Sequence, residues 1–388
     1  MQPRRTRATL FVLATAAATL ACGVARADDI RVQSRAVPAT VIYDGVGATG
    51  LTAYNGYLVW SRYLPEHGVW QLMQWHDGIL RPLPVLPRSV PFDVSAGSSA
   101  TGRPVAVFSR CRVEPKDVVG VMPDPRWETA SGCSLYQLGL DGTFPLFRLN
   151  RVGPKLSLTT PSIHRGQIAA VRYDRSGDRT RAHVLLWRRG SRRPVELPGG
   201  SLPSCAGYSK SCSLVRSRTA VDALSLGPVS AAILWRVEGP GVIGTGLGWE
   251  LRTTTLARRR SVVVQSGYTS GACGFRQPFA PTATPDGGVS YVDWASPCEQ
   301  LQTALARFRL ATLQRREARP AGAYVFGAAS DGMNTYWLRG QLPGAPAAGT
   351  PPGPAFPCVQ ADRHCEIVVT RSPPYQAGRA GAGHPATF

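Results

Sequence analysis

The sequence predicts an all-β fold, a β-propeller of six four-stranded antiparallel blades within a range of five to seven. Short apolar runs rich in Val, Leu, Trp and Tyr alternate with turns rich in Gly, Pro and Asp along most of the 388 residues. After the N-terminus, no long segment has the 3.6-residue apolar period of a helix. The runs recur at spacings of 46 to 64 residues, which suits blades that carry loop insertions.

Each repeat is expected to contain two consecutive hairpins. In the first hairpin, a tight turn such as Asn55-Gly56 or Asp331-Gly332 precedes an apolar strand. In the second hairpin, the turn is Asp77-Gly78 in the first repeat and Asp141-Gly142 in the next. Asn-Gly and Asp-Gly favour the positive φ that two-residue hairpin turns need. An inner and an outer hairpin together therefore make one four-stranded blade.

The repeats divide the chain into blades and flanking segments. The second strand of each blade is expected to end near Trp60, Phe108, Val171, Trp235, Tyr291 and Trp337. The expected blades are residues 45–89, 90–151, 155–200, 215–267, 275–320 and 322–371. Residues 30–43 are expected to supply the outer strand that closes the ring. Residues 28–372 would then form one propeller domain and residues 373–388 a disordered tail. The alternative is an open sandwich or two smaller β domains.

The fifth repeat contains the segment Ala-Thr-Pro-Asp-Gly-Gly-Val-Ser-Tyr-Val at residues 283–292. This segment resembles the Pro-Asp-Gly repeat of TolB-like and WD-like bacterial propellers, in which the same turn leads into an apolar strand. Residues 330–332, Ser-Asp-Gly, repeat it without the Pro. The resemblance implies a propeller fold, an extracytoplasmic location and a role in binding partners.

The first 27 residues have the features of an export signal. A basic region with Arg4, Arg5 and Arg7 precedes the apolar residues 8–21, and residues 25–27 are Ala-Arg-Ala. Cleavage after Ala27 would lower the net charge from +20 to +16. Lipid attachment at Cys22 is an alternative, and an uncleaved apolar helix is another. We therefore expect a secreted or extracytoplasmic protein, which under the first of these alternatives would be lipid-anchored at Cys22.

The composition excludes several classes of protein. A hydrophobic content of 43% is too high for a disordered chain despite the charge. No apolar stretch of membrane-spanning length follows the N-terminus, so a multi-span membrane protein is excluded. The 44 basic residues exceed the 24 acidic ones, but only three are Lys. Because Arg, Ala, Gly and Pro all have GC-rich codons, base composition is an alternative explanation for the Arg excess.

The cysteines also indicate export. Without Cys22, eight remain, an even number that is typical of disulfides in an oxidising compartment. They form four sequence-local pairs: Cys111 and Cys133, Cys205 and Cys212, Cys273 and Cys298, and Cys358 and Cys365. Sequential pairing is favoured because each loop that it closes is short, although other connectivities remain open. No C-x-x-C motif occurs, so a cysteine metal site is not indicated and no metal is expected.

Three Arg-rich segments occupy one repeat position, the turn of the outer hairpin. They contain Arg188, Arg189, Arg192 and Arg193 in the third blade, Arg258, Arg259 and Arg260 in the fourth, and Arg315 and Arg316 in the fifth. If the register is right, these side chains share one side of the ring and form a local positive field for acidic polymers or anionic lipid heads. No aromatic residues are interleaved with them, so the sequence gives no specific nucleic-acid signal. Solvated turns without a ligand are the alternative.

Motifs for catalysis are sparse. Gly45, Gly47 and Gly50 match G-x-G-x-x-G but lead into a strand, so no nucleotide cofactor is expected. His76 beside Asp77 is expected to be a solvated turn pair. His164 lies at an inner-hairpin turn and could face the central channel.

We therefore predict an exported, non-catalytic propeller that binds a protein or cell-envelope partner, with no cofactor. One alternative is an envelope or polyanion-binding protein that uses the Arg-rich turns. Another is a lyase or hydrolase that acts at the channel.

Overall fold

The computed structural model describes most of the repeat region of the chain. The described residues are 30–31, 40–45, 47–118, 124–142, 145–149, 155–176, 179–199, 218–238, 247–268, 275–296, 302–309, 311, 314–318, 324–340 and 365–371. The predicted export signal, Cys22 and the predicted tail 373–388 lie outside this set.

The described residues form almost only strands. Their one helical segment is a single 3-10 turn, η1 (Trp127–Thr129). Within these residues, no helix is both long and apolar enough to cross a membrane. The prediction of an all-β fold is confirmed.

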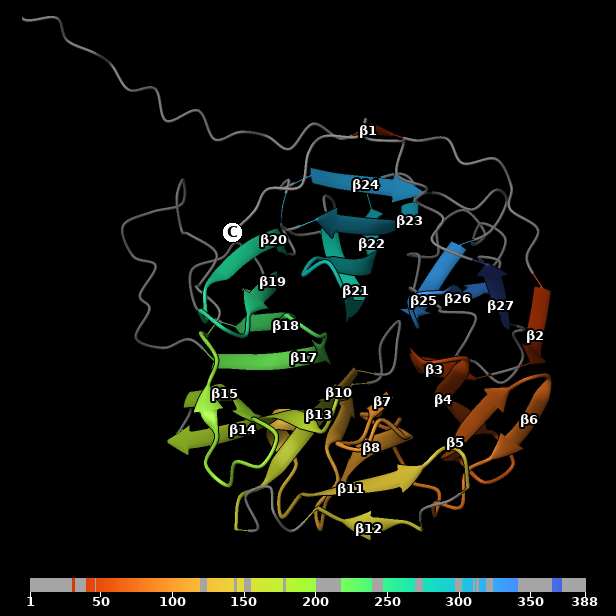
Figure 1. Cartoon of the computed structure of the whole chain (residues 1–388), viewed down its shortest axis with the longest axis horizontal. Helices are drawn as coiled ribbons and strands as arrows, with labels where there is room; N and C mark the ends of the chain where they lie inside the picture. The colour runs from red at the N-terminus through yellow and green to blue at the C-terminus, as the bar shows by residue number, and fades with distance from the viewer. Residues whose placement is uncertain are drawn as a thin grey trace, which may run out of the picture.

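Six sheets of four or more strands radiate around a common centre (Figure 1). Five of them have four strands, and the sixth has a fifth strand at its outer edge. We number them blades one to six in chain order. The sheets are antiparallel throughout their four blade strands, so the predicted propeller is confirmed.

The strands follow the predicted blades within a few residues. Blades one to three contain β3 (Ala48–Tyr54), β4 (Tyr57–Leu64), β5 (Val69–His76) and β6 (Ile79–Pro82); β7 (Ser95–Ser98), β8 (Pro104–Arg110), β11 (Ser134–Gly139) and β12 (Phe147–Arg148); and β13 (Leu158–His164), β14 (Gln167–Ser176), β15 (Arg179–Trp187) and β16 (Val195–Glu196). Blades four to six contain β17 (Arg218–Leu226), β18 (Ser230–Glu238), β19 (Leu247–Thr255) and β20 (Ser261–Tyr268); β21 (Phe275–Ala283), β22 (Val289–Ser296), β23 (Gln302–Arg309) and β24 (Gln314–Ala318); and β25 (Tyr324–Ser330), β26 (Asn334–Gly340), β27 (Cys365–Arg371) and β2 (Thr40–Gly45). A separate two-stranded sheet, β9 (Lys116–Val118) and β10 (Asp124–Arg126), lies in the insertion of blade two.

The N-terminal strand β2 closes the ring, as predicted. It pairs antiparallel with β27 and becomes the outer strand of blade six, whose other three strands come from the end of the chain. Tyr43 of β2 is buried, and its ring lies 5.5 Å from that of Trp60 in blade one. The short strand β1 (Ile30–Arg31) pairs in parallel with β24 at the outer edge of blade five (Figure 1).

The apolar core lies between neighbouring blades. Each blade packs against a blade on either side, so its middle strands are buried on both faces and contain continuous apolar runs. One cluster joins Trp70 of blade one to Phe108 of blade two, and another joins Val184 of blade three to Trp235 of blade four. This burial explains why the second strand of each blade gave the clearest repeat in the sequence.

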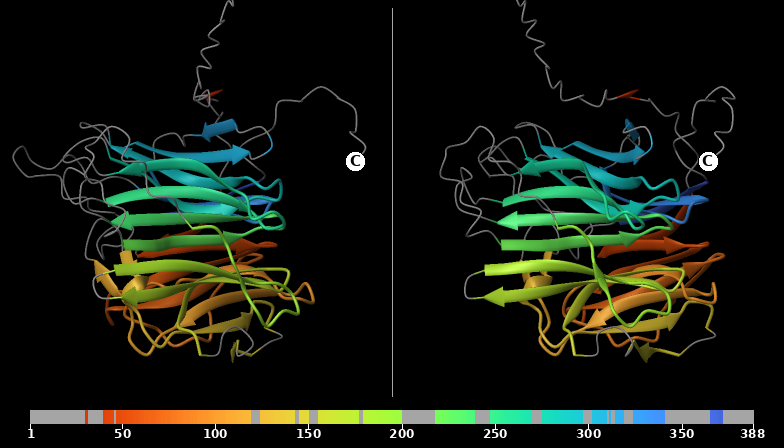
Figure 2. Two further views of the ribbon diagram at one scale, coloured as in Figure 1. Left: turned by 90° about the vertical axis from the view of Figure 1, so that its left-hand side faces the viewer. Right: turned by 60° about the vertical axis from the view of Figure 1, so that its left-hand side comes forward.

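The tight turns have the predicted backbone. Asn55 and Gly56 have φ values of 48° and 81°, and Asp77 and Gly78 have 47° and 80°. Gly tolerates positive φ without steric cost, and Asn and Asp tolerate it better than most residues. Since strands in a blade are antiparallel, both hairpin turns of a blade lie at the same end of its strands. We call that end of the ring the turn face and the opposite end the connection face; Figure 2 shows the strands running between these two ends.

Hydroxyl side chains on the innermost strands join one blade to the next. The Oγ1 atom of Thr52 accepts a bond from Ala96 N (2.9 Å), and Ser162 Oγ accepts one from Leu226 N (2.8 Å). Ser225 Oγ accepts another from the innermost strand of blade five, at Ala283 N (3.0 Å). These bonds satisfy backbone N–H groups that the edge of a sheet would otherwise leave unpaired.

Candidate functional site

The first candidate surface is the group of arginines on the turn face. Arg188, Arg189, Arg192 and Arg193 lie between β15 and β16, and Arg258, Arg259 and Arg260 lie between β19 and β20. All seven side chains are exposed, and none makes an ion pair with another described residue. The turns belong to blades three and four, which are adjacent in the ring. We call these seven residues the Arg turns.

The third predicted cluster has a different local structure. Arg315 and Arg316 lie inside β24, where they pair with Phe308 and Arg307 of β23, and not in the preceding turn. The expected turn position was therefore wrong for these two residues. Their register places Arg316 beside Ile30 of β1, because β1 adds to the same edge. The pairing of β24 with β23 places the two arginines within a strand. The run of charged residues in the sequence did not indicate this pairing.

Acidic turns occupy the equivalent positions of other blades. Asp77 of blade one is 84% exposed, and Asp141 of blade two is exposed. Asp77 lies 3.3 Å from His76 Nε2, and the His76 ring stacks on Tyr57 with a centroid distance of 3.7 Å. The predicted turn pair is therefore present. The turn face is basic over blades three and four, whereas the outer turns of blades one and two carry Asp77 and Asp141, with the exposed Arg81 donating to Leu140 O (3.1 Å) beside Asp141.

The second candidate site is a cavity of about 330 Å³ on the ring axis. Its walls come from the first strand of every blade, and these strands contact one another around the axis. Tyr54, His164 and Asp331 line the end at the turn face. Thr49 lines the other end, because it stands near the start of β3, and Asp222 lines the wall from the centre of β17. We call this space the axial cavity.

His164 reaches the axial cavity, as the sequence suggested. Burial lowers the pKa of His164, and the neighbouring Arg165 lowers it further. Its Nε2 atom is buried without a hydrogen-bond partner. A histidine that acts as a general base is normally oriented by a second group, and no carboxylate bonds to His164 among the described residues.

Asp331 joins the two blades, six and one, between which the ring closes. Its Oδ2 atom accepts a bond from Gly56 N of blade one (2.8 Å) and another from the Tyr336 hydroxyl (3.2 Å). Burial raises the pKa of Tyr336, and the negative charge of Asp331 raises it further. Asp331 therefore joins blade six to blade one, which is a structural role at the mouth of the axial cavity.

The insertion of blade two reaches the connection-face end of the axial cavity. It runs between β8 and β11 and contains β9, β10 and η1, and its Pro125 and Trp127 line the cavity. Glu128 Oε1 accepts a bond from Arg236 of blade four (2.8 Å), and Ala130 O accepts one from Arg175 of blade three (2.5 Å). The insertion thus contacts three of the blades. Sequence reasoning expected a stapled loop here and missed these long-range contacts.

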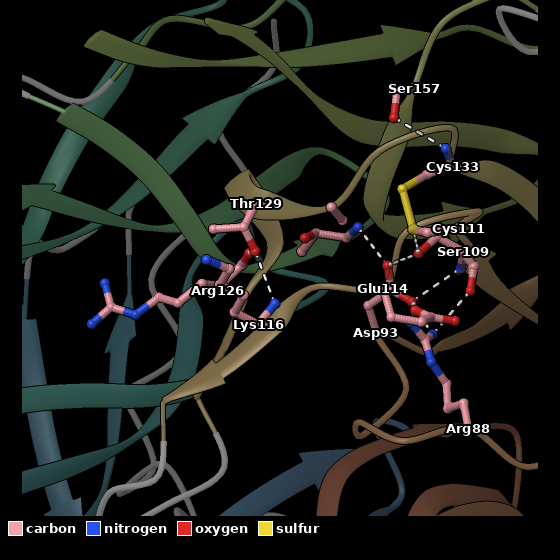
Figure 3. Close-up of a disulfide and its surroundings, with 12 residues drawn as sticks. Arg88, Asp93, Ser109, Cys111, Glu114, Lys116, Arg126, Thr129, Cys133 and Ser157 are labelled. Carbon is pink, nitrogen blue, oxygen red and sulfur yellow. Dashed lines mark hydrogen bonds and ion pairs between the residues drawn. A yellow bond between two sulfur atoms is a disulfide. The ribbon is translucent and has the colours of Figure 1, made fainter. Parts of the chain in front are cut away.

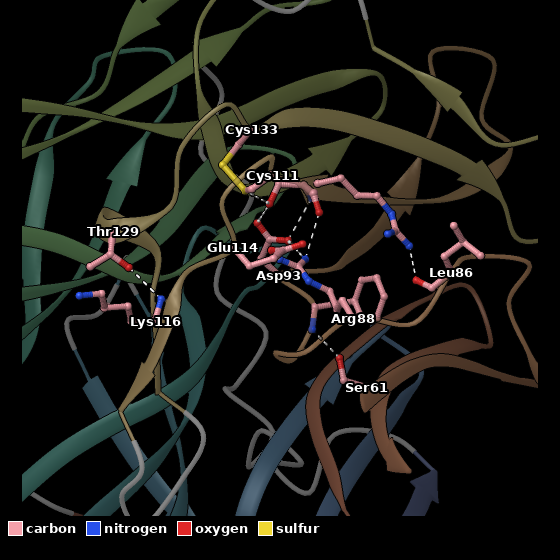
Figure 4. Close-up of polar contacts among 12 residues, drawn as sticks. Ser61, Leu86, Arg88, Asp93, Cys111, Glu114, Lys116, Thr129 and Cys133 are labelled. Atoms are coloured by element: carbon pink, nitrogen blue, oxygen red, sulfur yellow. Dashed lines mark hydrogen bonds and ion pairs between the residues drawn. A yellow bond between two sulfur atoms is a disulfide. The ribbon is translucent and has the colours of Figure 1, made fainter. Parts of the chain in front are cut away.

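A buried ionic group lies beside the base of the insertion (Figure 3). Arg88, whose side chain is 2% exposed, pairs with Glu114 of the insertion and lies 3.7 Å from Asp93 Oδ1. Figure 4 shows Arg88 beside these two carboxylates. Asp93 accepts bonds from Ser109 N (3.0 Å), Ser109 Oγ (2.6 Å) and Thr160 N (2.7 Å). Burial raises the pKa of Asp93, and Arg88 and these donors offset part of the rise.

One predicted disulfide is present, between Cys111 and Cys133 at the two ends of the insertion (Figure 3). Cys365 is also disulfide-bonded and is fully buried in β27. The other predicted disulfide cysteines, Cys205, Cys212, Cys273, Cys298 and Cys358, lie outside the described residues.

Replacing Cys111 and Cys133 together with serine should lower the free energy of unfolding by about 3 kcal/mol. The disulfide closes a loop with a sequence separation of 22 residues, and its loss restores the conformational entropy of the unfolded chain. Urea denaturation followed by tryptophan fluorescence measures the change. The variant Val113→Ala, at an exposed position of the same insertion, should change the value by less than about 0.5 kcal/mol. Equal stability of the double variant and the wild type would contradict the stapling role.

A histidine and two carboxylates also meet on the outside of blade three. His183 Nδ1 lies 2.7 Å from Glu196 Oε1, and His183 Nε2 lies 3.2 Å from Asp174 Oδ2. Each ring nitrogen therefore lies within hydrogen-bonding distance of a carboxylate oxygen. No group of three or more metal-ligating side chains has the geometry of a metal site in the part of the chain that the structure describes.

The molecule is a β-propeller, and the known proteins to which it is similar are solved structures. No protein-family model and no curated protein sequence matches the chain. Among solved structures, it is similar to the alpha-L-arabinanase of Penicillium chrysogenum, with 10% identity, a TM-score of 0.46, and coverage of 87% of this chain and 98% of that one. TolB from Acinetobacter baumannii has 10% identity, a TM-score of 0.39, and coverage of 82% and 64%.

An acylaminoacyl peptidase is a third similar structure, with 13% identity and a TM-score of 0.39 over 76% of this chain. The chain spans 42% of the length of that peptidase. These proteins have different stated activities, so the shared architecture does not select a ligand or a reaction.

Proposed function

We propose that this chain is an exported, non-catalytic binding propeller that recognises a linear polyanion through the Arg turns. The observation that carries the proposal is the placement of seven exposed, unpaired arginines on two adjacent blades of one face. The other proposed elements are the export signal of residues 1–27 and an extracytoplasmic location. The Cys111–Cys133 disulfide supports them, because disulfides persist mainly in oxidising compartments.

Arginine suits this role physically. Its planar guanidinium is always charged and makes paired hydrogen bonds to carboxylate, sulfate and phosphate groups. A single surface ion pair contributes little, so affinity has to come from several contacts made together. Two neighbouring turns allow a linear polymer to contact both groups, whereas a small anion contacts only one.

The aspartates in the outer turns of blades one and two favour one path for a polyanion across the turn face. Asp77 and Asp141 occupy the outer-turn positions that arginines occupy in blades three and four. A polyanion is therefore attracted more strongly over blades three and four than over blades one and two, where Arg81 lies beside Asp141. The proposed binding path therefore lies along blades three and four.

Catalysis at the axial cavity has weaker support. A lyase or hydrolase would need an oriented base, and His164 has no hydrogen-bonded carboxylate among the described residues. The binding proposal therefore does not include a reaction.

Replacing the seven arginines of the Arg turns with glutamine should weaken binding to heparin, a sulfated polysaccharide probe, by at least about a hundredfold at 0.15 M salt. The loss follows because each removed charge removes one contact with the polymer. The affinity of the variant should also depend less steeply on salt concentration than that of the wild type, because fewer ion pairs with the polymer remain to be screened. Isothermal titration calorimetry over a series of salt concentrations measures both effects.

A matched pair of triple variants separates position from net charge. R258Q/R259Q/R260Q and R112Q/R148Q/R181Q remove the same charge from exposed positions, and only the first belongs to the Arg turns. The first should weaken binding much more than the second. Equal losses would show that total charge governs binding and would overturn the proposal. Binding to anionic lipid vesicles without binding to soluble polymers would overturn it in favour of a membrane surface.

A further inference from the structure

The outer strand of blade four differs from the outer strands of the other blades. β20 has eight residues, Ser-Val-Val-Val-Gln-Ser-Gly-Tyr, and none of them is charged or a proline. Proteins keep an open sheet edge from pairing with other chains by making it short or by placing charges and prolines on it. The other outer strands are shorter, and each contains a charged residue: Arg81 in β6, Arg148 in β12, Glu196 in β16, Arg315, Arg316 and Glu317 in β24, and Asp44 in β2.

The outer edge of β20 is open within the described residues. The strand order of blade four is β17-β18-β19-β20, and β20 pairs only with β19. Thr255 N donates to Arg260 O (2.9 Å) where this pairing begins. In the alternation of an antiparallel ladder, the backbone groups of Val262 therefore point toward β19, and those of Ser261 and Val263 point outward. The outward N–H and C=O groups can pair with a further strand.

Blade five shows that a blade of this ring can take such a strand. β1 pairs in parallel with the outer edge of β24, so blade five has five strands and blade four, its neighbour, has four. β24 takes this strand although three of its five residues are charged. Because β20 is longer and uncharged, it offers more backbone positions for pairing than β24 does.

Side chains hold β20 firmly against the ring. Val262 and Val264 pack against the apolar cluster between blades four and five. Gln265 is 8% exposed, and its Nε2 atom donates to Asp293 Oδ1 of blade five (2.7 Å). The edge is therefore formed in advance, and binding does not have to order it. Val263 points to the opposite face of the sheet and is 44% exposed, so an apolar side chain of an added strand can pack against it.

A β-bulge at Val264 bends this edge. The register shifts between Leu251 and Arg252, which leaves Val264 without a Cα partner on β19. Two rigid copies of a bent edge do not fit one another along their length, and one pair of edge strands is small beside the roughly 1,200–2,000 Å² that a stable protein interface buries. A flexible peptide can follow the bend. The bulge therefore favours an extended segment of another protein over a second copy of this chain.

Three cations stand at one end of the edge. Arg258, Arg259 and Arg260 are exposed and directly precede β20 on the turn face. A strand that is added to β20 has one end beside these arginines, where acidic residues complement their charge. Antiparallel pairing is slightly more stable than parallel pairing, and it places the C-terminal end of the added strand there.

We propose that the outer edge of β20 binds an extended segment of a partner protein, an uncharged β-strand followed by acidic residues, which joins blade four as a fifth, antiparallel strand. Backbone hydrogen bonds supply the affinity, and Arg258, Arg259 and Arg260 select the acidic end. This inference does not rest on polyanion binding, because it needs the backbone of β20 and only one of the two groups of arginines.

A peptide of sequence Thr-Val-Thr-Val-Thr-Val-Glu-Glu-Glu, labelled with fluorescein at its N-terminus, tests the proposal on the full chain with its disulfide intact. Fluorescence anisotropy at physiological salt concentration should show saturable binding. The same peptide with Lys in place of the three Glu should bind much more weakly, because the arginines repel it. Hydrogen exchange at the amides of Ser261 and Val263 should slow when the acidic peptide is bound.

Val263→Pro separates backbone pairing from charge. It removes an outward N–H and leaves the ladder with β19 intact, since proline is tolerated on the solvent side of an edge strand. It should lower the peptide affinity by about tenfold, because one hydrogen bond is lost and a carbonyl of the peptide is left unpaired. Val263→Thr keeps the N–H and nearly the same shape, so it should leave the affinity unchanged.

A pair of triple variants tests the charged end even where Val263→Pro impairs folding. R258Q/R259Q/R260Q should lower the peptide affinity by about tenfold. R188Q/R189Q/R192Q removes the same charge from the turn of blade three and should leave the peptide affinity unchanged. Heparin binding by Val263→Pro should equal that of the wild type, so failure of this inference is distinguishable from failure of the proposed function.

Four results would overturn the proposal. They are no peptide binding at millimolar concentration, equal affinities of Val263→Pro and Val263→Thr, equal losses in the two triple variants, and unchanged hydrogen exchange at Ser261 and Val263 in the bound state. A wild-type dimer in analytical ultracentrifugation that Val263→Pro dissociates would also overturn it, and would assign the edge to a second copy of this chain.

Discussion

Replacing Arg236 with alanine should lower the free energy of unfolding by about 3 to 5 kcal/mol. Arg236 is fully buried in β18, where Nη2 donates to Glu128 Oε1 at 2.8 Å and Nη1 lies 3.3 Å from Asp222 Oδ1. Removing the guanidinium takes a shared cationic partner away from two carboxylates whose side chains are only 17% and 18% exposed. Breaking a buried ion pair on one side costs more than the pair itself contributes, because the remaining charge is uncompensated.

A surface ion pair of the same chemical type provides the control. Arg339 Nε donates to Glu366 Oε2 at 2.7 Å, and the two side chains are 31% and 38% exposed. Arg339→Ala should therefore cost only about 0 to 1 kcal/mol. Chemical denaturation of both variants in the same buffer gives the comparison. If Arg236→Ala costs no more than Arg339→Ala, the contact between the insertion and blade four does not stabilise the ring.

Deleting residues 28–45 should destabilise the propeller by at least about 5 kcal/mol. The deletion removes β2, whose five Cα partners on β27 complete blade six, and with it the buried ring of Tyr43. It also exposes Cys365 and Ile367, both fully buried in the closed ring. The deletion removes β2 whole, so the loss of its backbone hydrogen bonds and the loss of the buried Tyr43 ring both lower the free energy of unfolding.

A shorter deletion distinguishes ring closure from the mere loss of N-terminal residues. Deleting residues 28–31 removes β1, which only adds a fifth strand to the outer edge of blade five. That variant should stay within about 1 kcal/mol of the wild type. Hydrogen exchange should show β27 losing protection only in the longer deletion. Equal stability of the two deletions would contradict closure by β2.

The blade pattern could be predicted because it depends on local sequence. Middle strands buried on both sides give apolar runs around residues such as Trp60 and Trp235, and Asn55-Gly56 and Asp77-Gly78 favour the turn backbone whatever lies around them. The same locality explains why the Cys111–Cys133 pair was predicted correctly. The closing role of β2 followed from counting strands, since one blade lacked its outer strand.

The candidate sites were only partly predictable. The Arg turns of blades three and four follow from the repeat register. Arg315 and Arg316 were expected in the preceding turn, but strand β24 begins at Gln314 and includes both of them. No periodic pattern in the sequence predicts the contact between Glu128 and Arg236, which are more than a hundred residues apart in the chain. A sequence signal for the contacts between blades did exist, a Ser or Thr toward the turn-face end of the first strand, as at Thr52 and Ser225.

By itself, the sequence determined the all-β repeat, the approximate blade boundaries and the positions of the hairpin turns, because strand burial and turn backbone are properties of short segments. Only the tertiary structure decided that the insertion of blade two reaches blade four and that the wall of the axial cavity contains Asp222, Thr160 and Trp127 but, among the described residues, no Lys or Arg. Those features bring together residues from different blades, and their proximity depends on the way the ring closes. The physical reason is that contacts across a closed ring come from packing between blades, which no local pattern of residues encodes.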